Sequence, residues 1–80
     1  MQYENISPEL LEGKWSKVTL VVQWQLRETN VQAELNCYES RGRYNYRVDE
    51  SIISNGNEDL MHIWFELEED ATYFALKFAS

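Results

Sequence analysis

The stretch from Leu60 to Phe78 changes its hydrophobic period once, and this change constrains the fold more than any other feature of the sequence. Up to Leu67 apolar and polar residues alternate, which is the period of a strand with one buried face. After residue 70 the apolar residues recur at the spacing of an amphipathic helix. These residues are Ala71, Phe74, Ala75 and Phe78. The sequence therefore predicts a strand that runs directly into a helix.

Charged residues mark both ends of this expected helix. Three acids, Glu68, Glu69 and Asp70, stand where the free N–H groups and the dipole of a first helical turn favour negative charge. Lys77 stands at the other end, where a cation is favoured. The alternative is a second strand in a hairpin, with Thr72, Phe74, Leu76 and Phe78 on one face. We favour the helix, because a hairpin does not explain the charges at its ends.

Two further segments alternate in the same way. Apolar residues occupy every second position from Lys17 to Arg27, which predicts a strand near the middle of a sheet. A second strand is expected over 43–53, with Tyr44 and Tyr46 pointing inward. The turn sequence Ser54-Asn55-Gly56-Asn57 follows it and predicts an antiparallel hairpin with the strand that begins near Leu60.

The segment between these strands, 28–42, allows two interpretations. Thr29 and Gln32 resemble a capping box, and Gly42 stands where a helix C-terminal glycine would stand. Alternation of Val31, Ala33, Leu35 and Cys37 would instead form a hairpin with the preceding strand. We favour the helix, since both of its ends are marked. Residues 1–13 are expected to form a short lead-in with one or two helical turns, begun at Ser7-Pro8.

Eighty residues are enough for one domain with one core, which we expect to span 1–80. The predicted order of elements is strand, helix, strand, strand, helix. This order predicts an α+β fold: a small antiparallel sheet with helices on one face, similar to an incomplete ferredoxin-like arrangement that lacks its last strand. If the two ambiguous segments are strands, the fold is an all-β meander with a short N-terminal helix.

The formal net charge of −7 comes entirely from the C-terminal part of the chain. Six acids and six bases cancel up to Arg47, whereas 48–80 holds eight acids and one base. A negative field repels nucleic-acid phosphates and anionic lipids, and it attracts basic protein surfaces. We therefore expect no direct binding of nucleic acid. Solubility alone is the simpler explanation of the acidity.

The chain has no apolar run near eighteen residues and no secretory signal, so we expect no membrane span and a place in the cytoplasm. Cys37 and His62 are its single cysteine and histidine, and no motif surrounds either. We expect Cys37 to be a small core residue and His62 an exposed strand residue. The acidic pairs lack the spacing of a calcium loop. We predict no metal, no cofactor and no enzymatic activity.

The C-terminal half resembles small, uncharacterised accessory proteins of tailed bacteriophages. The resemblance rests on Trp64-Phe65-Glu66-Leu67-Glu68-Glu69-Asp70-Ala71, followed by Phe74, Leu76, Lys77 and Phe78, and on Gly42-Arg43-Tyr44 upstream. It covers about half of the chain and describes a structural junction rather than a chemical site. The resemblance implies a phage accessory protein in the cytoplasm of a host cell. It identifies no catalytic residue in this sequence.

These observations lead to a hypothesis about function. We expect a non-enzymatic protein that binds and modulates or inhibits a host protein with a basic surface, one route being to occupy a nucleic-acid-binding surface. Trp64 would be an exposed contact, unless Trp15 or Tyr3 covers it. Arg43 and Arg47 would face outward and form cross-strand pairs with glutamate. The alternative is a self-associating structural or accessory subunit, a homodimer that uses the same sheet face or an open edge strand. The expected contact residues are Trp64, Glu66, Glu68, Glu69, Asp70, Glu58, Asp59, Arg43 and Arg47.

Overall fold

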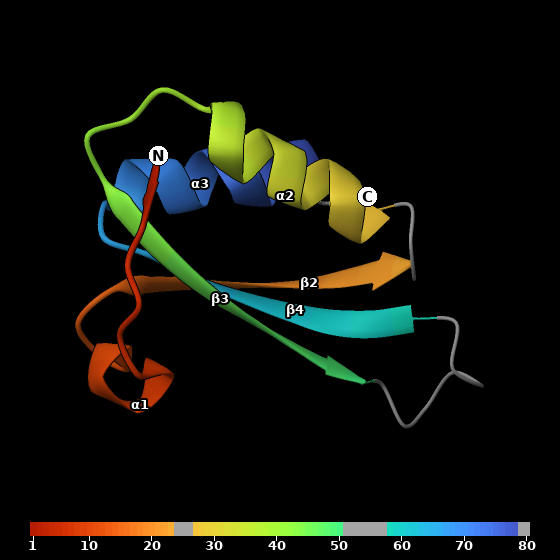
Figure 1. Ribbon diagram of the computed structural model, residues 1–80, viewed down its shortest axis with the longest axis horizontal. Helices are drawn as coiled ribbons and strands as arrows, with labels where there is room; N and C mark the ends of the chain where they lie inside the picture. The colour runs from red at the N-terminus through yellow and green to blue at the C-terminus, as the bar shows by residue number, and fades with distance from the viewer. Residues whose placement is uncertain (24–26, 51–57, 79–80) are drawn as a thin grey trace.

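Four strands and three helices make up the computed structural model, which describes residues 1–23, 27–50 and 58–78 (Figure 1). In chain order the elements are β1 (Gln2–Tyr3), α1 (Pro8–Leu11), β2 (Ser16–Gln23), α2 (Arg27–Cys37), β3 (Arg43–Glu50), β4 (Glu58–Phe65) and α3 (Glu68–Phe78). This is the predicted α+β fold. Both ambiguous segments are helices, so the all-β alternative is wrong. The predicted turn at 54–57 lies outside the described residues.

The strands form one sheet in the order β1-β3-β4-β2. β4 lies between β2 and β3 and is antiparallel to both, with Ile63 opposite Val18 on one side and Tyr46 on the other. The unit β2-α2-β3 with β4 inserted is the split βαβ arrangement that the ferredoxin-like prediction describes. The sheet is not purely antiparallel, because β1 pairs in parallel with the start of β3, where Gln2 lies opposite Arg43.

The main core lies between the sheet and the helices α2 and α3, which cover the same face (Figure 1). Alternation places Met61, Ile63 and Phe65 on this face, and each is fully buried. The helical spacing of Val31 and Leu35 in α2 places both in the same core. Val31 and Leu35 are four residues apart, so a helix places both on the face that packs against the core. This burial explains why α2 is a helix although its residues also alternate. The other fully or largely buried members are Leu20, Val22, Tyr44, Ala71 and Phe74.

The N-terminal segment wraps around the β3 edge of the sheet (Figure 1). It begins on the helix side, where the amino group of Met1 donates a hydrogen bond to the Tyr38 carbonyl, 2.5 Å away. It then pairs with β3 as β1 and ends in α1 on the opposite face. There the side-chain amide of Asn45 donates to the carbonyl oxygens of Glu4 and Ile6. The second face of the sheet is therefore covered at one end.

Trp64 lies under this cover. Its cross-strand neighbours are Asn45 and Lys17, and its side chain is 2% exposed. Leu11 of α1 is also buried, and neither residue belongs to the main core cluster. The expectation of an exposed Trp64 is wrong, because its side chain is buried. Of the two residues expected to cover it, Tyr3 packs against Tyr44 and Tyr46 and Trp15 packs against Arg43. The reason that Trp64 is buried is the path of the N-terminal segment, which local periodicity does not reveal.

Several predicted boundaries also shift. The strand expected over 17–27 is described from Ser16 to Gln23, whereas 24–26 lie outside the described residues and Arg27 is the first residue of α2. α2 ends at Cys37, so Gly42 does not cap it and instead precedes β3. Cys37 is exposed rather than a core residue. Among the described helices, none is long and apolar enough to cross a bilayer.

Candidate functional site

The acids among the expected contact residues lie at two separate ends of β4. Glu58 and Asp59 begin the strand, whereas Glu66 follows its last residue. Eight residues of extended chain span roughly 26 Å, which is several times the reach of a single ion pair. Asp59 is 9% exposed, so it presents little charge to a partner. The two groups therefore form separate charge clusters, and the group at the start of α3 lies beside the hollows described below.

Glu66 is held by Arg43 across the β3–β4 pair. The guanidinium donates to Glu66 Oε2 from Nη2 at 2.6 Å and from Nε at 3.1 Å. The backbone N–H of Arg43 donates to Glu66 Oε1 at 3.2 Å. Hydrogen bonding to Arg43 lowers the pKa of Glu66 below its ordinary value, and the same contact raises the pKa of Arg43. The predicted cross-strand Arg–Glu pair is confirmed for Arg43.

Arg43 also anchors the N-terminal part of the chain. Its Nη1 lies 3.5 Å from a carboxylate oxygen of Glu4, and its guanidinium stacks 5.3 Å from the ring centroid of Trp15. One cation thus joins β3, the residue after β4, the segment after β1 and the loop before β2. A residue with this many internal contacts is committed to the fold, so Arg43 and Glu66 are poor candidates for binding a partner.

Arg47 pairs with Asp49 on its own strand, at 3.1 Å, rather than with a glutamate across the sheet. Asp49 Oδ2 also lies 3.2 Å from His62 Nε2, and His62 Nδ1 lies 3.0 Å from the hydroxyl of Thr19. This chain of contacts crosses β3, β4 and β2 on the face opposite the main core. His62 is only partly exposed, since its side chain keeps 15% of its accessible surface.

Asp70 is buried, although it was expected to contact a partner. Its side chain is 2% exposed and accepts a hydrogen bond of 2.6 Å from the Ser40 hydroxyl. The same hydroxyl oxygen accepts from the backbone N–H of Gly42 at 3.0 Å. These contacts fix the α2–β3 loop to the first turn of α3. Asp70 therefore shapes the site without presenting its charge to a partner.

Three acids around this junction remain exposed: Glu68 and Glu69 in the first turn of α3, and Glu39 in the α2–β3 loop. None has an ion-pair partner among the described residues. A hollow of about 590 Å³ is lined by Leu67, Glu68, Glu69 and Thr72. A second hollow, of about 330 Å³, lies between α3 and the loop and shares Leu67 and Glu69 with the first. We call Glu39, Leu67, Glu68, Glu69 and Thr72 the α3 shelf.

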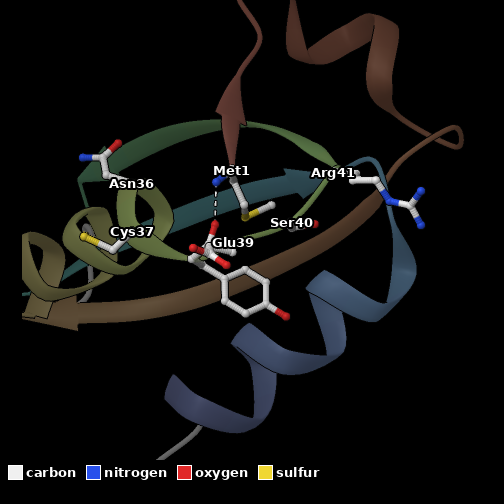
Figure 2. Close-up of a pocket in the computed structure, with 7 residues that line it drawn as sticks. Met1, Asn36, Cys37, Glu39, Ser40 and Arg41 are labelled. Atoms are coloured by element: carbon white, nitrogen blue, oxygen red, sulfur yellow. Dashed lines mark hydrogen bonds between the residues drawn. The ribbon is translucent and has the colours of Figure 1, made fainter.

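A third hollow, of about 530 Å³, opens where α2 ends (Figure 2). Residues 36–41 and Met1 line it, including Glu39 of the shelf. The sulfur of Cys37 and the amide of Asn36 lie at one side of it, and the guanidinium of Arg41 extends away at the other. The α2–β3 loop therefore borders hollows on both sides. Arg41 is its one cation and has no acid partner among the described residues.

An exposed leucine continues the shelf along α3. Leu76 is 76% exposed, and it stands four residues after Thr72 and eight after Glu68. Residues at this spacing lie on one side of a helix. From the sequence, Leu76 had a place in the hairpin alternative and in the phage resemblance but not on a binding surface, although the helical spacing of these three residues could have identified the stripe.

At the C-terminal end of α3 the charge of Lys77 is paired with that of Glu34. Lys77 Nζ lies 3.0 Å from Glu34 Oε2, and the Tyr73 hydroxyl donates to the other oxygen of Glu34 at 2.7 Å. Hydrogen bonding to Tyr73 and Lys77 lowers the pKa of Glu34, and the pairing with Glu34 raises the pKa of Lys77. The uncompensated charge of the helix is therefore concentrated at its first turn.

The described residues contain no group of three or more His, Cys, Asp or Glu side chains arranged to hold a metal ion. Comparison of the chain with protein-family models, curated proteins and solved structures found no match.

Proposed function

We propose that the protein is a non-enzymatic binder that docks on a basic surface of another protein through the α3 shelf. One observation carries this proposal. Five acids are each paired with a neighbouring cation, whereas the three exposed acids of the shelf lie together and have no such partner among the described residues. The paired acids are Glu4, Glu12, Glu34, Asp49 and Glu66.

The helix itself accounts for part of this acidity, since Glu68 and Glu69 stabilise the positive end of the α3 dipole. Two features go beyond what the helix needs. Glu39 lies on the loop rather than in the helix, yet it borders the same hollow as Glu69. Leu76 places an apolar side chain beside the acids. An apolar anchor rimmed by like charges is a common composition for a surface that recognises one partner.

The chemistry of the shelf defines the class of partner. A patch of carboxylates favours a surface rich in Lys and Arg, and proteins that bind nucleic acids carry such surfaces. In this proposal the shelf occupies a nucleic-acid-binding surface by presenting negative charge where phosphates would lie. The phage resemblance, which stays a prediction, would make that partner a host protein.

The test compares two variants that carry the same change of charge in different places. Glu68→Lys/Glu69→Lys reverses the shelf. Glu9→Lys/Glu12→Lys reverses two exposed acids on and after α1, on the other face of the sheet, and serves as the control. Each protein is immobilised, exposed to bacterial lysate at about 0.05 M salt, and then washed at about 0.5 M. This change shortens the Debye length from roughly 14 Å to roughly 4 Å.

We expect the unmodified chain and the control to retain the same basic protein at low salt, and the shelf variant to lose it. High salt and a competing DNA duplex should both release that protein. If all three chains retain the same proteins, the shelf is not the binding surface. If DNA does not compete, the partner is bound away from its nucleic-acid-binding surface.

A further inference from the structure

Strand β2 lies at the end of the sheet and pairs on one side only. Its eight residues all find partners in β4, from Ser16 opposite Phe65 to Gln23 opposite Glu58. Within residues 1–23, 27–50 and 58–78, no backbone group bonds to the other edge of β2. An open edge of this length is a template for another strand.

The usual protections of an edge strand are missing from β2. It contains no proline and no glycine. Its one charged residue, Lys17, stands next to its first residue, where Glu12 pairs with it at 3.4 Å and the Trp64 ring lies 5.2 Å from its ammonium nitrogen. Val21, by contrast, is 50% exposed near the other end. Natural edge strands normally carry charges or prolines at such positions.

The topology leaves room for a strand of defined direction beside β2. A complete ferredoxin-like arrangement continues from its second helix into one more strand. In this protein α3 packs more extensively on β2 than on β4. A right-handed crossover that starts at β4 and runs through α3 would therefore place the next strand at the open edge of β2. A strand placed there in this way runs parallel to β4 and therefore antiparallel to β2.

The charge pattern identifies the occupant. The chain carries a net charge of −7, so two copies repel each other over most of their surfaces. Residues 18–26 form the longest uncharged run of the sequence, and β2 supplies six of them. At this edge two copies can approach without bringing like charges together. Moreover, the β2 strand of a copy related by a two-fold axis runs antiparallel, as the vacant position requires.

We propose that the protein forms a two-fold symmetric dimer in which the open edges of β2 pair with each other. Residues that lie opposite each other must be on the same face of the sheet. The two-fold axis therefore lies where one residue is opposite its own copy, not where two successive residues are opposite each other. An axis at Leu20 pairs seven residues and sets Val18 opposite Val22 of the second copy. It also sets Thr19 opposite Val21 of the second copy. The inward-facing row of Val18, which is partly buried, and Leu20 and Val22, which are buried, then continues from one core into the next.

The first test uses sedimentation velocity over a hundredfold range of concentration. We expect the 9.5 kDa chain to approach twice its mass as concentration rises. Val21→Lys places two like charges near the axis and should weaken dimerisation at least tenfold. Leu10→Lys makes the same change at an exposed leucine of α1, which is 61% exposed, and should leave dimerisation unchanged. A chain that stays monomeric throughout, or equal weakening by both variants, overturns the proposal. Circular dichroism establishes that both variants fold.

The second test fixes the register and needs no destabilising change. In a Cys37→Ser background, a chain with Thr19→Cys is mixed with a chain carrying Val21→Cys under mild oxidation. The proposed axis predicts that the mixed disulfide forms faster than either symmetric one, because only residues 19 and 21 oppose each other. Preferential 19–19 or 21–21 disulfides overturn the axis at Leu20. The absence of any disulfide overturns edge pairing itself.

Discussion

The backbone of Gly42 and the carboxylate of Asp70 lie so close together that a β-carbon at residue 42 would stand 2.6 Å from Asp70 Oδ2. The same β-carbon would stand 3.0 Å from Leu67 Cγ. Glycine is therefore required here for a close approach between β3 and the start of α3. This contact, together with the Ser40 hydroxyl, positions the α2–β3 loop beside the shelf.

Replacing Gly42 with alanine should destabilise the protein by about 1–3 kcal/mol, the usual cost of overpacking a closely packed site. Chemical denaturation measures the loss. In a background carrying Asp70→Ala the added cost of Gly42→Ala should be smaller, because the nearest clashing atom is gone while Leu67 remains. Equal costs in the two backgrounds would contradict the contact.

Trp64 should behave as a structural residue. Trp64→Ala removes a large buried side chain and should cost about 3–5 kcal/mol, enough to threaten the stability of an 80-residue domain. Trp64→Phe should cost much less, because the indole Nε1 is buried without an acceptor among the described residues. Thermal unfolding measures both. Partner capture by Trp64→Phe should equal that of the unmodified chain, and a selective loss of capture would argue for a contact role.

The pair of Glu66 and Arg43 should make stability depend on pH in the acid range. Folding lowers the pKa of Glu66 from its ordinary value of 4.5. The pair's contribution is therefore fully present above about pH 4.5 and is lost as the pH falls through the folded-state pKa. We expect the melting temperature of Glu66→Gln to lie below that of the unmodified chain at pH 7.

The difference between the two melting temperatures should shrink as the pH is lowered from 5 to about 2. Arg43→Gln should reproduce this behaviour, since it removes the other half of the pair. A difference that stays constant over this range would show that the ion pair does not shift the pKa.

Cys37 should react with a thiol reagent in the native protein. Its side chain is exposed at the end of α2, beside a hollow (Figure 2). We expect one equivalent of thiol to titrate without denaturant. If Cys37 were a core residue, as expected from the sequence, its thiol would react only after the protein unfolds. Titration with and without denaturant therefore distinguishes an exposed Cys37 from a buried one.

The sequence predicted those features that depend on neighbours along the chain. Alternation located β2, β3 and β4 to within a few residues, because a strand with one face in the core needs an apolar residue at every second position. Charges at the ends identified α3, since an isolated helix favours acids at its start and a base at its end. The inward direction of Tyr44 and Tyr46 followed from the same alternation.

Only the tertiary structure decided which polar and aromatic residues are available to a partner. Trp64 has the periodicity of an exposed position and is buried, because a segment about sixty residues earlier in the chain covers it. Asp70 belongs to a helical acid cluster and is buried, because the α2–β3 loop returns to it. Local patterns determine secondary structure through interactions within a few residues. Exposure depends on contacts between distant segments, which no local pattern encodes.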